Sequence, residues 1–421
     1  MNPASSYDVI IAGGGPGGST AATFLAREGK RVLLLEKERF PRFHIGESLL
    51  PYGNDVLCDL GVIEKIEAAG FLPKYGAEFC TSDRVRRVRF WFARNLGDKY
   101  ERAFQVERAK FDHVLLQHAG ESGAEIHEGA KVKTLERPSE NEIRVTWEEN
   151  GATHTASAPW LIDASGRDAF AASALGLKRV ATQPTRRVAI FGHFRGVFRN
   201  EGKAANHITI VRFGSGWFWF IPLDAEKTSV GMVLANTELR ASKQTPEEAF
   251  AAAVAGHEEL RFRLEKAERI GPIHTTGDYS YRHDRFASDR VILVGDAAGF
   301  IDPIFSSGVM LALKSARRAA QLILAAGPQP LSTAQQKAYT VDVTKWMTVY
   351  SQMISAFYDR AGFEIFMNPA PVLQMTKAIA HVVGGDTDLS LAHQLRLKAF
   401  YFVCWLQRWF RVVPRLSFQE R

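Results

Sequence analysis

The N-terminal part of the chain alternates between short apolar runs and longer amphipathic segments. Tyr7–Ala12 and Arg31–Glu36 are dominated by branched apolar side chains and are too short for helices, so they predict buried strands. Pro16–Glu28 between them predicts a helix, and Phe111–Ser122 predicts a second, amphipathic helix. Further strands are predicted at 143–147 and 160–164. This order of elements is typical of an α/β domain with a parallel sheet.

From Arg187 to Val233 the pattern changes to aromatic-rich strands broken by Gly and Pro, which predicts an antiparallel sheet. Pro246–Lys266 is predicted to be helical, a buried strand returns at Val291–Val294, and nearly everything beyond Gly308 has a helical pattern. The chain is therefore expected to leave the α/β domain and re-enter it. The expected limits are 1–75, 105–180 and 275–330 for the α/β domain, 76–104 and 181–274 for an inserted substrate domain, and 331–421 for a helical C-terminal region.

Composition excludes several classes of protein. With 46% hydrophobic and 24% charged residues over 421 positions, the chain has the make-up of a folded globular protein. No apolar run approaches the roughly 20 residues that span a bilayer, and no secretory signal is found, so a cytoplasmic protein without a transmembrane segment is expected. The cysteines Cys58, Cys80 and Cys404 are scattered, which argues against a disulfide framework and against a zinc site. No metal is expected.

The charge balance is mildly basic. The 53 Lys and Arg residues exceed the 46 Asp and Glu residues and leave a net charge of +7. Basic residues cluster at 84–94 and again at 396–415. A solvated surface is the simpler interpretation, because net charge sets solubility and steering and not function. Attraction of an acidic partner is the alternative, and nucleic acid is disfavoured because no nucleic-acid-binding signature accompanies the charge.

A glycine motif follows the first predicted strand and opens the first predicted helix. It has the spacing Gly13-x-Gly15-x-x-Gly18, and Glu36 ends the second strand. The three glycines permit a tight turn, close approach of a pyrophosphate and close helix packing, and the acid accepts hydrogen bonds from ribose hydroxyls. The helix N-terminus attracts the phosphates. This combination predicts a Rossmann-type dinucleotide site.

Three further segments resemble the para-hydroxybenzoate hydroxylase-like (GR2) superfamily of FAD proteins. They are Arg290–Gly299 with its Gly295-Asp296 pair, Leu161–Arg167 around Asp163 and Gly166, and the segment from Phe40 to Ser48 with Arg42. The resemblance implies a Rossmann-type FAD-binding domain with FAD as the cofactor. It implies cofactor contacts at Gly13, Gly15, Pro16, Gly17, Gly18, Glu36, Lys37, Arg42, Ile45, Gly46, Glu47, Ser48, Arg108, Asp163, Gly166, Gly295, Asp296, Pro303 and Gly308.

Two motifs and one lysine are similar to those of flavin-dependent halogenases. The motifs are Trp217-x-Trp219-x-Ile221-Pro222 and Phe300-x-x-Pro303-x-x-Ser306-x-Gly308, and Lys74 falls where the family carries its catalytic lysine. The resemblance covers roughly residues 5–330 and is strongest to halogenases of pyrrole and phenol rings, which are related to the tryptophan halogenases. The C-terminal helices carry no motif of the family.

The resemblance implies a reaction of FADH2, oxygen and a halide ion, chloride or bromide. A flavin C4a-hydroperoxide is attacked by halide held on the Ser307 and Gly308 amides. Trp217 and Trp219 separate flavin from substrate, and Lys74 delivers hypohalous acid to an electron-rich ring, free or tethered to an acyl or peptidyl carrier protein. With no second nucleotide motif, reduced flavin is expected from a separate reductase. No general base is assigned.

Simpler interpretations remain open at this stage. A Trp pair at period two is usually core packing, and a lone lysine is usually solvated. An FAD-dependent monooxygenase, epoxidase or geranylgeranyl-reductase-like oxidoreductase would share the fold. The aromatic and basic segment 395–418 is interpreted as an amphipathic helix on the body, with a substrate mouth or a membrane surface as alternatives.

Overall fold

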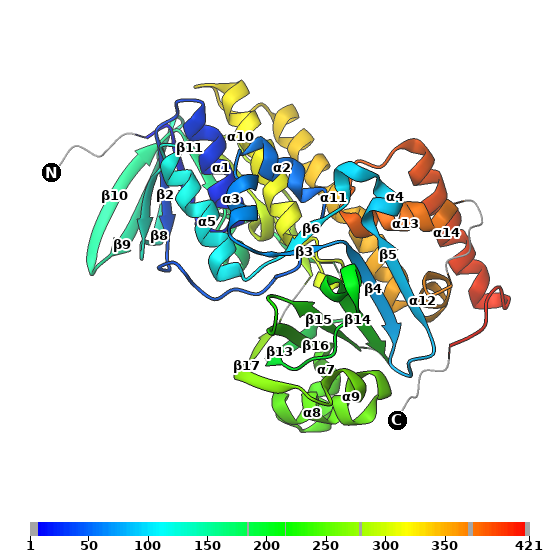
Figure 1. Cartoon of the computed structure of the whole chain (residues 1–421). Helices are drawn as coiled ribbons and strands as arrows, with labels where there is room; N and C mark the ends of the chain where they lie inside the picture. The colour runs from blue at the N-terminus through cyan, green and yellow to red at the C-terminus, as the bar shows by residue number, and fades with distance from the viewer. Residues whose placement is uncertain (1–6, 183–184, 215, 278–279, 369–373, 417–421) are drawn as a thin grey trace.

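A five-stranded parallel sheet forms the centre of the α/β domain (Figure 1). The computed structural model of the protein describes residues 7–182, 185–214, 216–277, 280–368 and 374–416. The sheet has the order β19-β11-β1-β2-β7, and all its neighbours run parallel. The strands are β1 (Val9–Ala12), β2 (Val32–Glu36), β7 (Glu125–Glu128), β11 (Trp160–Asp163) and β19 (Val291–Leu293). The fold class expected from the sequence is confirmed.

Three helices cover the parallel sheet. Helix α1 (Pro16–Arg27) packs against both α5 (Arg108–Glu121) and α10 (Gly308–Ala326). Helix α5 begins three residues before the predicted Phe111, because Arg108 is fixed to Asp112 one turn later by a pair of hydrogen bonds. A polar first turn leaves no trace in the hydrophobic pattern. Shorter helices nearby are α2 (Gly53–Asp59), α3 (Ile63–Ala68), α4 (Phe92–Leu96) and α6 (Phe170–Ala174).

A seven-stranded sheet lies below the α/β domain in Figure 1. Its order is β17-β13-β16-β15-β14-β4-β5, and β4 runs parallel to β14, whereas the sequence predicted an antiparallel sheet throughout. The exception arises because β4 and β5 precede the inserted segment, so no hairpin joins β4 to β14. The strands are β4 (Gly76–Thr81), β5 (Arg87–Trp91), β13 (Arg187–Arg195), β14 (Ile208–Phe213), β15 (Gly216–Pro222), β16 (Thr228–Ala235) and β17 (Glu268–Gly277).

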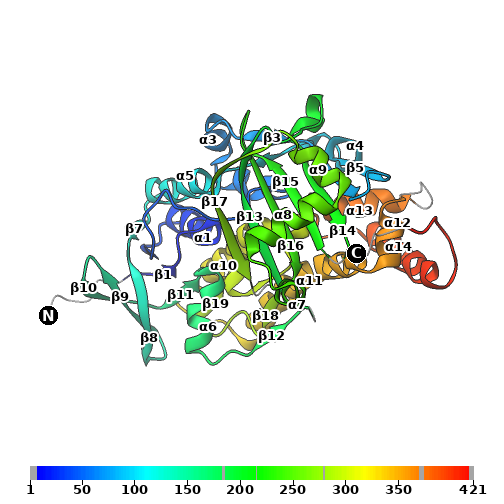
Figure 2. The same cartoon turned by 90° about the horizontal axis from the view of Figure 1, so that it is seen from below.

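The two faces of this sheet bury different partners. Phe218 and Phe220 on β15 pack in a cluster with residues of α8 (Pro246–Gly256) and α9 (Glu258–Leu264), which lie across the sheet in Figure 2. Trp217 and Trp219 alternate with them and belong to the core shared with the α/β domain. The single helix predicted over Pro246–Lys266 is wrong, because His257 adopts an extended conformation (φ −127°, ψ 131°) between α8 and α9.

Smaller sheets complete the two domains. Strand β3 (Leu72–Lys74) pairs with β6 (Ala103–Gln105), and this ribbon carries Lys74. One three-stranded sheet contains β8 (Lys131–Ser139), β9 (Glu142–Glu149) and β10 (Ala152–Ala158), and another contains β12 (Arg179–Ala181), β18 (Tyr281–His283) and β20 (Gly299–Phe300). Helix α7 (Asn236–Ser242) follows β16.

The C-terminal region is helical, as predicted, and lies beside β4 and β5 on the right of Figure 1. Its helices are α11 (Thr333–Tyr358), α12 (Arg360–Phe366), α13 (Met375–Gly384) and α14 (Leu391–Trp409). Helix α14 begins before the predicted start at 395 and ends at Trp409; Ser417 and Phe418 of the predicted segment lie outside the described residues. None of the helices described is both long and apolar enough to cross a membrane.

The Trp219 ring lies on Gly231 of the neighbouring strand. A Cβ atom at Gly231 would be 2.2 Å from the ring, so we expect Gly231→Ala to lower the free energy of unfolding by about 1–3 kcal/mol through overpacking. Gly256→Ala is the matched control, because a Cβ there meets nothing within 4 Å. Denaturant unfolding of both variants measures the effect. Equal midpoints would show that the sheet relaxes around Trp219.

Candidate active site

Helix α1 makes its closest contact with the sheet at the glycine turn. A Cβ at Gly18 would lie 1.8 Å from the Gly13 carbonyl oxygen, and Gly13 has φ +107° and no room for a side chain against Ala164. A Cβ at Gly15, in contrast, would meet only the Arg42 guanidinium at 3.5 Å. In the part of the chain that the structure describes, no side chain caps the N-terminus of α1. Its first amides are therefore available to phosphate groups, as a dinucleotide requires.

Glu36 holds this turn from the end of β2. One carboxylate oxygen accepts from the Gly14 amide at 2.6 Å and the other from the Glu38 amide at 2.9 Å. Each oxygen retains a lone pair. The buried carboxylate thus fixes the turn and keeps the capacity to accept from a ribose hydroxyl.

A buried ion pair fixes the loop around Gly46. The Arg108 guanidinium donates to both Asp112 oxygens at 2.7 and 2.9 Å and to the Ile45 carbonyl at 2.9 Å. Arg42 lies 3.2 Å from the same Asp112 carboxylate. Asp112 was missed in the sequence, although its i,i+4 spacing from Arg108 was the available signal. Arg108 and Arg42 are thereby positioned together with the loop that was predicted to contact the flavin.

Several buried polar atoms in the predicted flavin segments have no partner within the described protein. They are the second carboxylate oxygen of Glu47 and the hydroxyls of Ser48 and Ser307. The other Glu47 oxygen lies 2.9 Å from His193 Nε2 on β13. A buried group left without a hydrogen bond costs about 1–3 kcal/mol, so a polar ligand here would satisfy it. These atoms therefore fit a large polar cofactor such as FAD.

The two acidic residues of the later flavin segments differ in their surroundings. Asp163 accepts from the Ser165 amide and hydroxyl and from the Ala171 amide, at 2.6–3.0 Å, so it holds the turn before α6. Among the described residues, no group donates to the Asp296 carboxylate, and burial raises the pKa of Asp296 to about 6 against Arg108 and Arg167. Asp296 is thus the freer acceptor for a ligand hydroxyl, whereas Asp163 shapes the site.

Other predicted cofactor residues lie at the edges of these turns. Gly166 and Gly295 have positive φ angles of +67° and +57°, and the Gly295 amide donates to Ser315 at 2.9 Å. Lys37 forms an exposed ion pair with Asp168 at 2.5 Å. Lys37 is therefore engaged with protein at the surface.

The segment before α10 forms a tight turn. Pro303–Phe305 make a single 3-10 turn, Ser306 has φ +58°, and α10 begins at Gly308 with no side-chain cap. A Cβ at Gly308 would meet nothing within 4 Å. The first amides of a 19-residue helix are thus left to bind an anion, with the helix dipole favouring negative charge.

The two predicted tryptophans are anchored by hydrogen bonds. Trp217 Nε1 donates to the Tyr358 hydroxyl at 2.7 Å, and Tyr358 donates to Asp302 at 2.8 Å. Trp219 Nε1 donates to Ser229 at 3.1 Å, and the two indole rings lie 5.8 Å apart. The sequence did not single out Tyr358 or Asp302, which lie in two separate segments, both far along the chain from the strand. Their chain of hydrogen bonds ties the tryptophan strand to the turn before α10.

Lys74 is buried, with 1% of its surface exposed, so the solvated-lysine interpretation is wrong. Its Nζ donates to the Leu49 carbonyl at 2.9 Å and lies 5.5 Å from the centre of the Phe92 ring. Burial lowers the pKa of Lys74 to about 7. No carboxylate lies within ion-pair distance of this amine among the described residues. Near pH 7 the Lys74 amine therefore exists in both its charged and its neutral form.

Two nearby side chains were possible bases. Burial raises the pKa of Glu78, but Arg263, Arg89 and their neighbours outweigh it and hold that pKa at about 2, so Glu78 is a poor base. His207 lies against Gly76 and has neither ring nitrogen hydrogen-bonded within the described protein. Burial lowers the pKa of His207 to about 4, so its imidazole is neutral near pH 7 and is a weak base as well. The lack of a hydrogen-bond partner for His207 among the described residues could not be predicted from the sequence.

The first basic cluster is largely neutralised. Arg84 and Arg87 pair with Glu259, and Arg89 pairs with Glu78. Arg86 donates to Asn368 at 2.8 Å. The second cluster is different, because residues 389–416 contain no Asp or Glu. Lys398 and Arg411 there are exposed and have no carboxylate partner in the described part of the chain.

Comparison with known proteins shows the family to which the chain belongs. The model of an FAD binding domain matches residues 6–338. The chain is 36% identical over 342 residues to a 1H-pyrrole-2-carbonyl-[peptidyl-carrier protein] chlorinase of Pseudomonas fluorescens, covering 76% of each chain. It is 35% identical over 370 residues to a tryptophan 2-halogenase of Chondromyces crocatus, covering 85% of this chain and 69% of the relative.

Solved structures agree with the sequence relatives. The flavin-dependent brominase Bmp2 superposes with a TM-score of 0.83 at 29% identity, covering 96% of this chain and 100% of that chain. The myxobacterial chondrochloren halogenase CndH superposes with a TM-score of 0.77 at 30% identity, covering 95% and 97%. The similarity extends into the C-terminal helices, which carried no motif.

Lys74 should make stability depend on pH. Below about pH 7 the Lys74 amine is protonated in both the folded and the unfolded chain, and burying its charge destabilises the fold. In the unfolded chain the amine stays protonated up to about pH 10. The destabilisation therefore decreases as the pH rises from about 7 to about 10. We expect wild type to gain stability relative to Lys74→Met over this range. Denaturant unfolding as a function of pH measures it, with the exposed Lys133→Met as control. A difference that does not change with pH would contradict a lowered pKa.

Proposed function

The chain belongs to the flavin-dependent halogenase family, and from this premise we propose that it halogenates a pyrrole ring carried on a peptidyl carrier protein. The observation that carries the proposal is Lys74, a buried amine without a carboxylate partner among the described residues, whose pKa is lowered to about 7. Two relatives support the substrate class: the pyrrole-carbonyl carrier-protein chlorinase and a brominase of Pseudoalteromonas luteoviolacea that is 34% identical over 326 residues.

The residues around the glycine turn hold FAD in this proposal. The α1 amides and Arg42 bind the phosphates, Glu36 and Asp296 accept from hydroxyl groups, and the free Glu47 and Ser48 atoms satisfy polar edges of the cofactor. When bound and reduced, FAD supplies with oxygen the oxidant that converts halide to hypohalous acid. A separate reductase provides the reduced flavin, because the sequence has a single glycine-rich nucleotide motif.

The turn before α10 holds the halide, chloride or bromide. The Ser307 and Gly308 amides, together with the dipole of α10, offer positive charge without a cationic side chain. The free Ser307 hydroxyl adds a donor. Neutral amide donors leave the halide more nucleophilic than a paired ammonium group would, because the ammonium would withdraw more negative charge from the halide.

Trp217 and Trp219 keep the organic substrate away from the flavin, and Lys74 receives the small oxidant. The charged amine donates a hydrogen bond to hypohalous acid; the neutral amine exchanges one N–H hydrogen for the halogen and releases water. The ring carbon then takes the halogen and loses its proton, so that ring–H and HOX become ring–X and water.

The carrier protein docks on α14 and the residues that follow it. Leu391, Leu395, Phe402, Trp405 and Trp409 follow one another at helical spacing and are 50–72% exposed. The absence of acidic residues over 389–416 makes this surface complementary to an acidic carrier. The Arg84–Arg89 cluster is less suited, because Glu78 and Glu259 already neutralise it.

Replacing Lys74 should separate oxidant formation from substrate halogenation. We expect Lys74→Ala to keep halide-dependent production of trappable hypohalous acid but to lower halogenated product by about a hundredfold or more. The protein would be loaded with FAD, reduced without oxygen and mixed with oxygen, with and without chloride or bromide, in the presence of a monochlorodimedone-type trap. Lys133→Ala is the control. Hydrogen peroxide formed regardless of halide would favour a monooxygenase or reductase instead.

Charge reversal at Lys398 on α14 and at Arg411 just after it should affect only the tethered substrate. We expect Lys398→Glu with Arg411→Glu to raise KM for the carrier-bound pyrrole roughly tenfold and to leave a free pyrrole unchanged. Charge reversal at Arg84, Arg86 and Arg87 provides the comparison, with protein stability checked because these arginines are paired. Equal effects on both substrates would refute docking at α14.

A further inference from the structure

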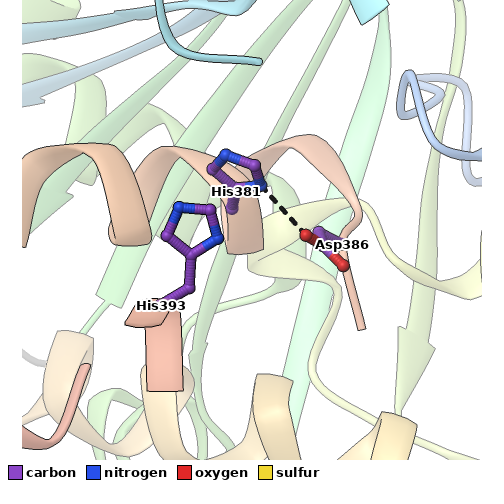
Figure 3. A group of neighbouring side chains, drawn as sticks. All are labelled: His381, Asp386 and His393. Carbon is purple, nitrogen blue, oxygen red and sulfur yellow. Dashed lines mark hydrogen bonds and ion pairs between the residues drawn. The ribbon is translucent and has the colours of Figure 1, made fainter. Parts of the chain in front are cut away.

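Three metal-ligand side chains, none of them among the residues assigned to the flavin site, meet at the turn between α13 and α14. His381 lies in the last turn of α13, Asp386 follows that helix, and His393 lies in the first turn of α14. One potential ligand atom of each residue lies within 4.8 Å of the other two. Figure 3 shows the two imidazole rings and the carboxylate around a common space. They are twelve residues apart at most, so little chain ordering is needed to bring them together.

Local interactions prearrange this cluster. Gly385 has φ +108°, which allows the chain to reverse directly after α13. One oxygen of Asp386 accepts from the Asp388 amide at 3.0 Å, which leaves the other 2.9 Å from His381 Nδ1. Ser390 caps α14 by accepting from the His393 amide at 3.3 Å. The backbone conformation of this turn thus orients the three side chains.

We propose that His381, Asp386 and His393 bind one divalent transition-metal ion, with zinc as the preferred ion, and that this ion closes the α13–α14 turn. Zinc favours four ligands drawn from imidazole nitrogen and carboxylate oxygen at about 2.0–2.2 Å, with water able to take the remaining position. The ion replaces the hydrogen shared by His381 and Asp386. His393 closes the remaining distance through its side-chain torsions, since it lies at the partly exposed end of the cluster.

The donors and their surroundings select the class of ion. Two imidazoles and one carboxylate suit zinc, nickel or copper, whereas calcium and magnesium need a shell of oxygen ligands. Lys314 is occupied by Thr387 and Asp388 and leaves Asp386 available.

The site would connect the C-terminal helices to the α/β domain. The Tyr52 hydroxyl lies 3.2 Å from His381 Nδ1, and its ring stacks on Tyr100 at 4.0 Å. Without metal, Tyr52 and Asp386 share the same nitrogen as hydrogen-bond partners. A bound ion would replace these weaker contacts by bonds to both helices. Cysteine spacing, which led us to expect no zinc, says nothing about a site built from histidine and aspartate.

Zinc titration of the metal-free full-length protein, with any purification tag removed, tests the proposal. In competition with a chromophoric chelator we expect one equivalent to bind with micromolar or tighter affinity and to raise Tm. His393→Ala should weaken binding by more than about a hundredfold, and Asp386→Asn should weaken it without loss of volume. His154→Ala, on the β8–β10 sheet, should bind as wild type.

The variants must keep the flavin content and metal-free Tm of wild type to count as folded. Absence of a stoichiometric equivalent, or unchanged affinity in folded His393→Ala, would overturn the site. Metal content is measured independently of halogenation. A failure of the proposed activity and a failure of this site are therefore distinguishable.

Discussion

The contact between two pieces of backbone, at Gly13 and Gly18, is the constraint on which the rest of the structure depends. With a Cβ at Gly18 only 1.8 Å from the Gly13 carbonyl, any larger residue would push α1 off the sheet. Because α1 also packs on α5 and α10, its position sets where Arg108 and the Ser307–Gly308 turn lie. One close helix–strand contact thus positions the phosphate-binding turn, the Gly46 loop and the anion-binding end of α10.

The protein treats buried charge in two opposite ways. Glu78 and Glu259 are surrounded by arginines, and these ion pairs hold strands and helices of the inserted sheet in one arrangement. Lys74 is buried, and its one hydrogen-bond partner among the described residues is a carbonyl oxygen, so its charge is destabilised rather than compensated. Placing the uncompensated cation on a separate two-stranded ribbon lets its protonation respond to small changes without disturbing the network.

Residues whose chemistry depends on local sequence were predictable, and those that depend on distant partners were not. The glycine turn, Glu36 and the halogenase motifs were found because their spacing is short and strand or helix context supports them. The fold class followed from hydrophobic runs, with errors where polar residues set the limits, as at His257 and Arg108. Asp112 was missed despite its local i,i+4 spacing from Arg108. Tyr358, and the His207 ring without a hydrogen-bond partner among the described residues, emerged only when the chain brought separate segments together. The parallel pairing of β4 with β14 was missed for the same reason.

The edge strand β19 has a consequence for how the chain reaches this structure. It completes the parallel sheet beside β11, yet more than a hundred residues of inserted sheet and helices lie between them in sequence. Contacts between residues so far apart in sequence slow folding, because the entropy of loop closure is lost before the stabilising contacts form. During synthesis, the glycine turn and its first strands emerge early but lack their edge strand until residue 293 has left the ribosome. The parallel sheet therefore remains without its edge strand until the second half of the chain has been synthesised.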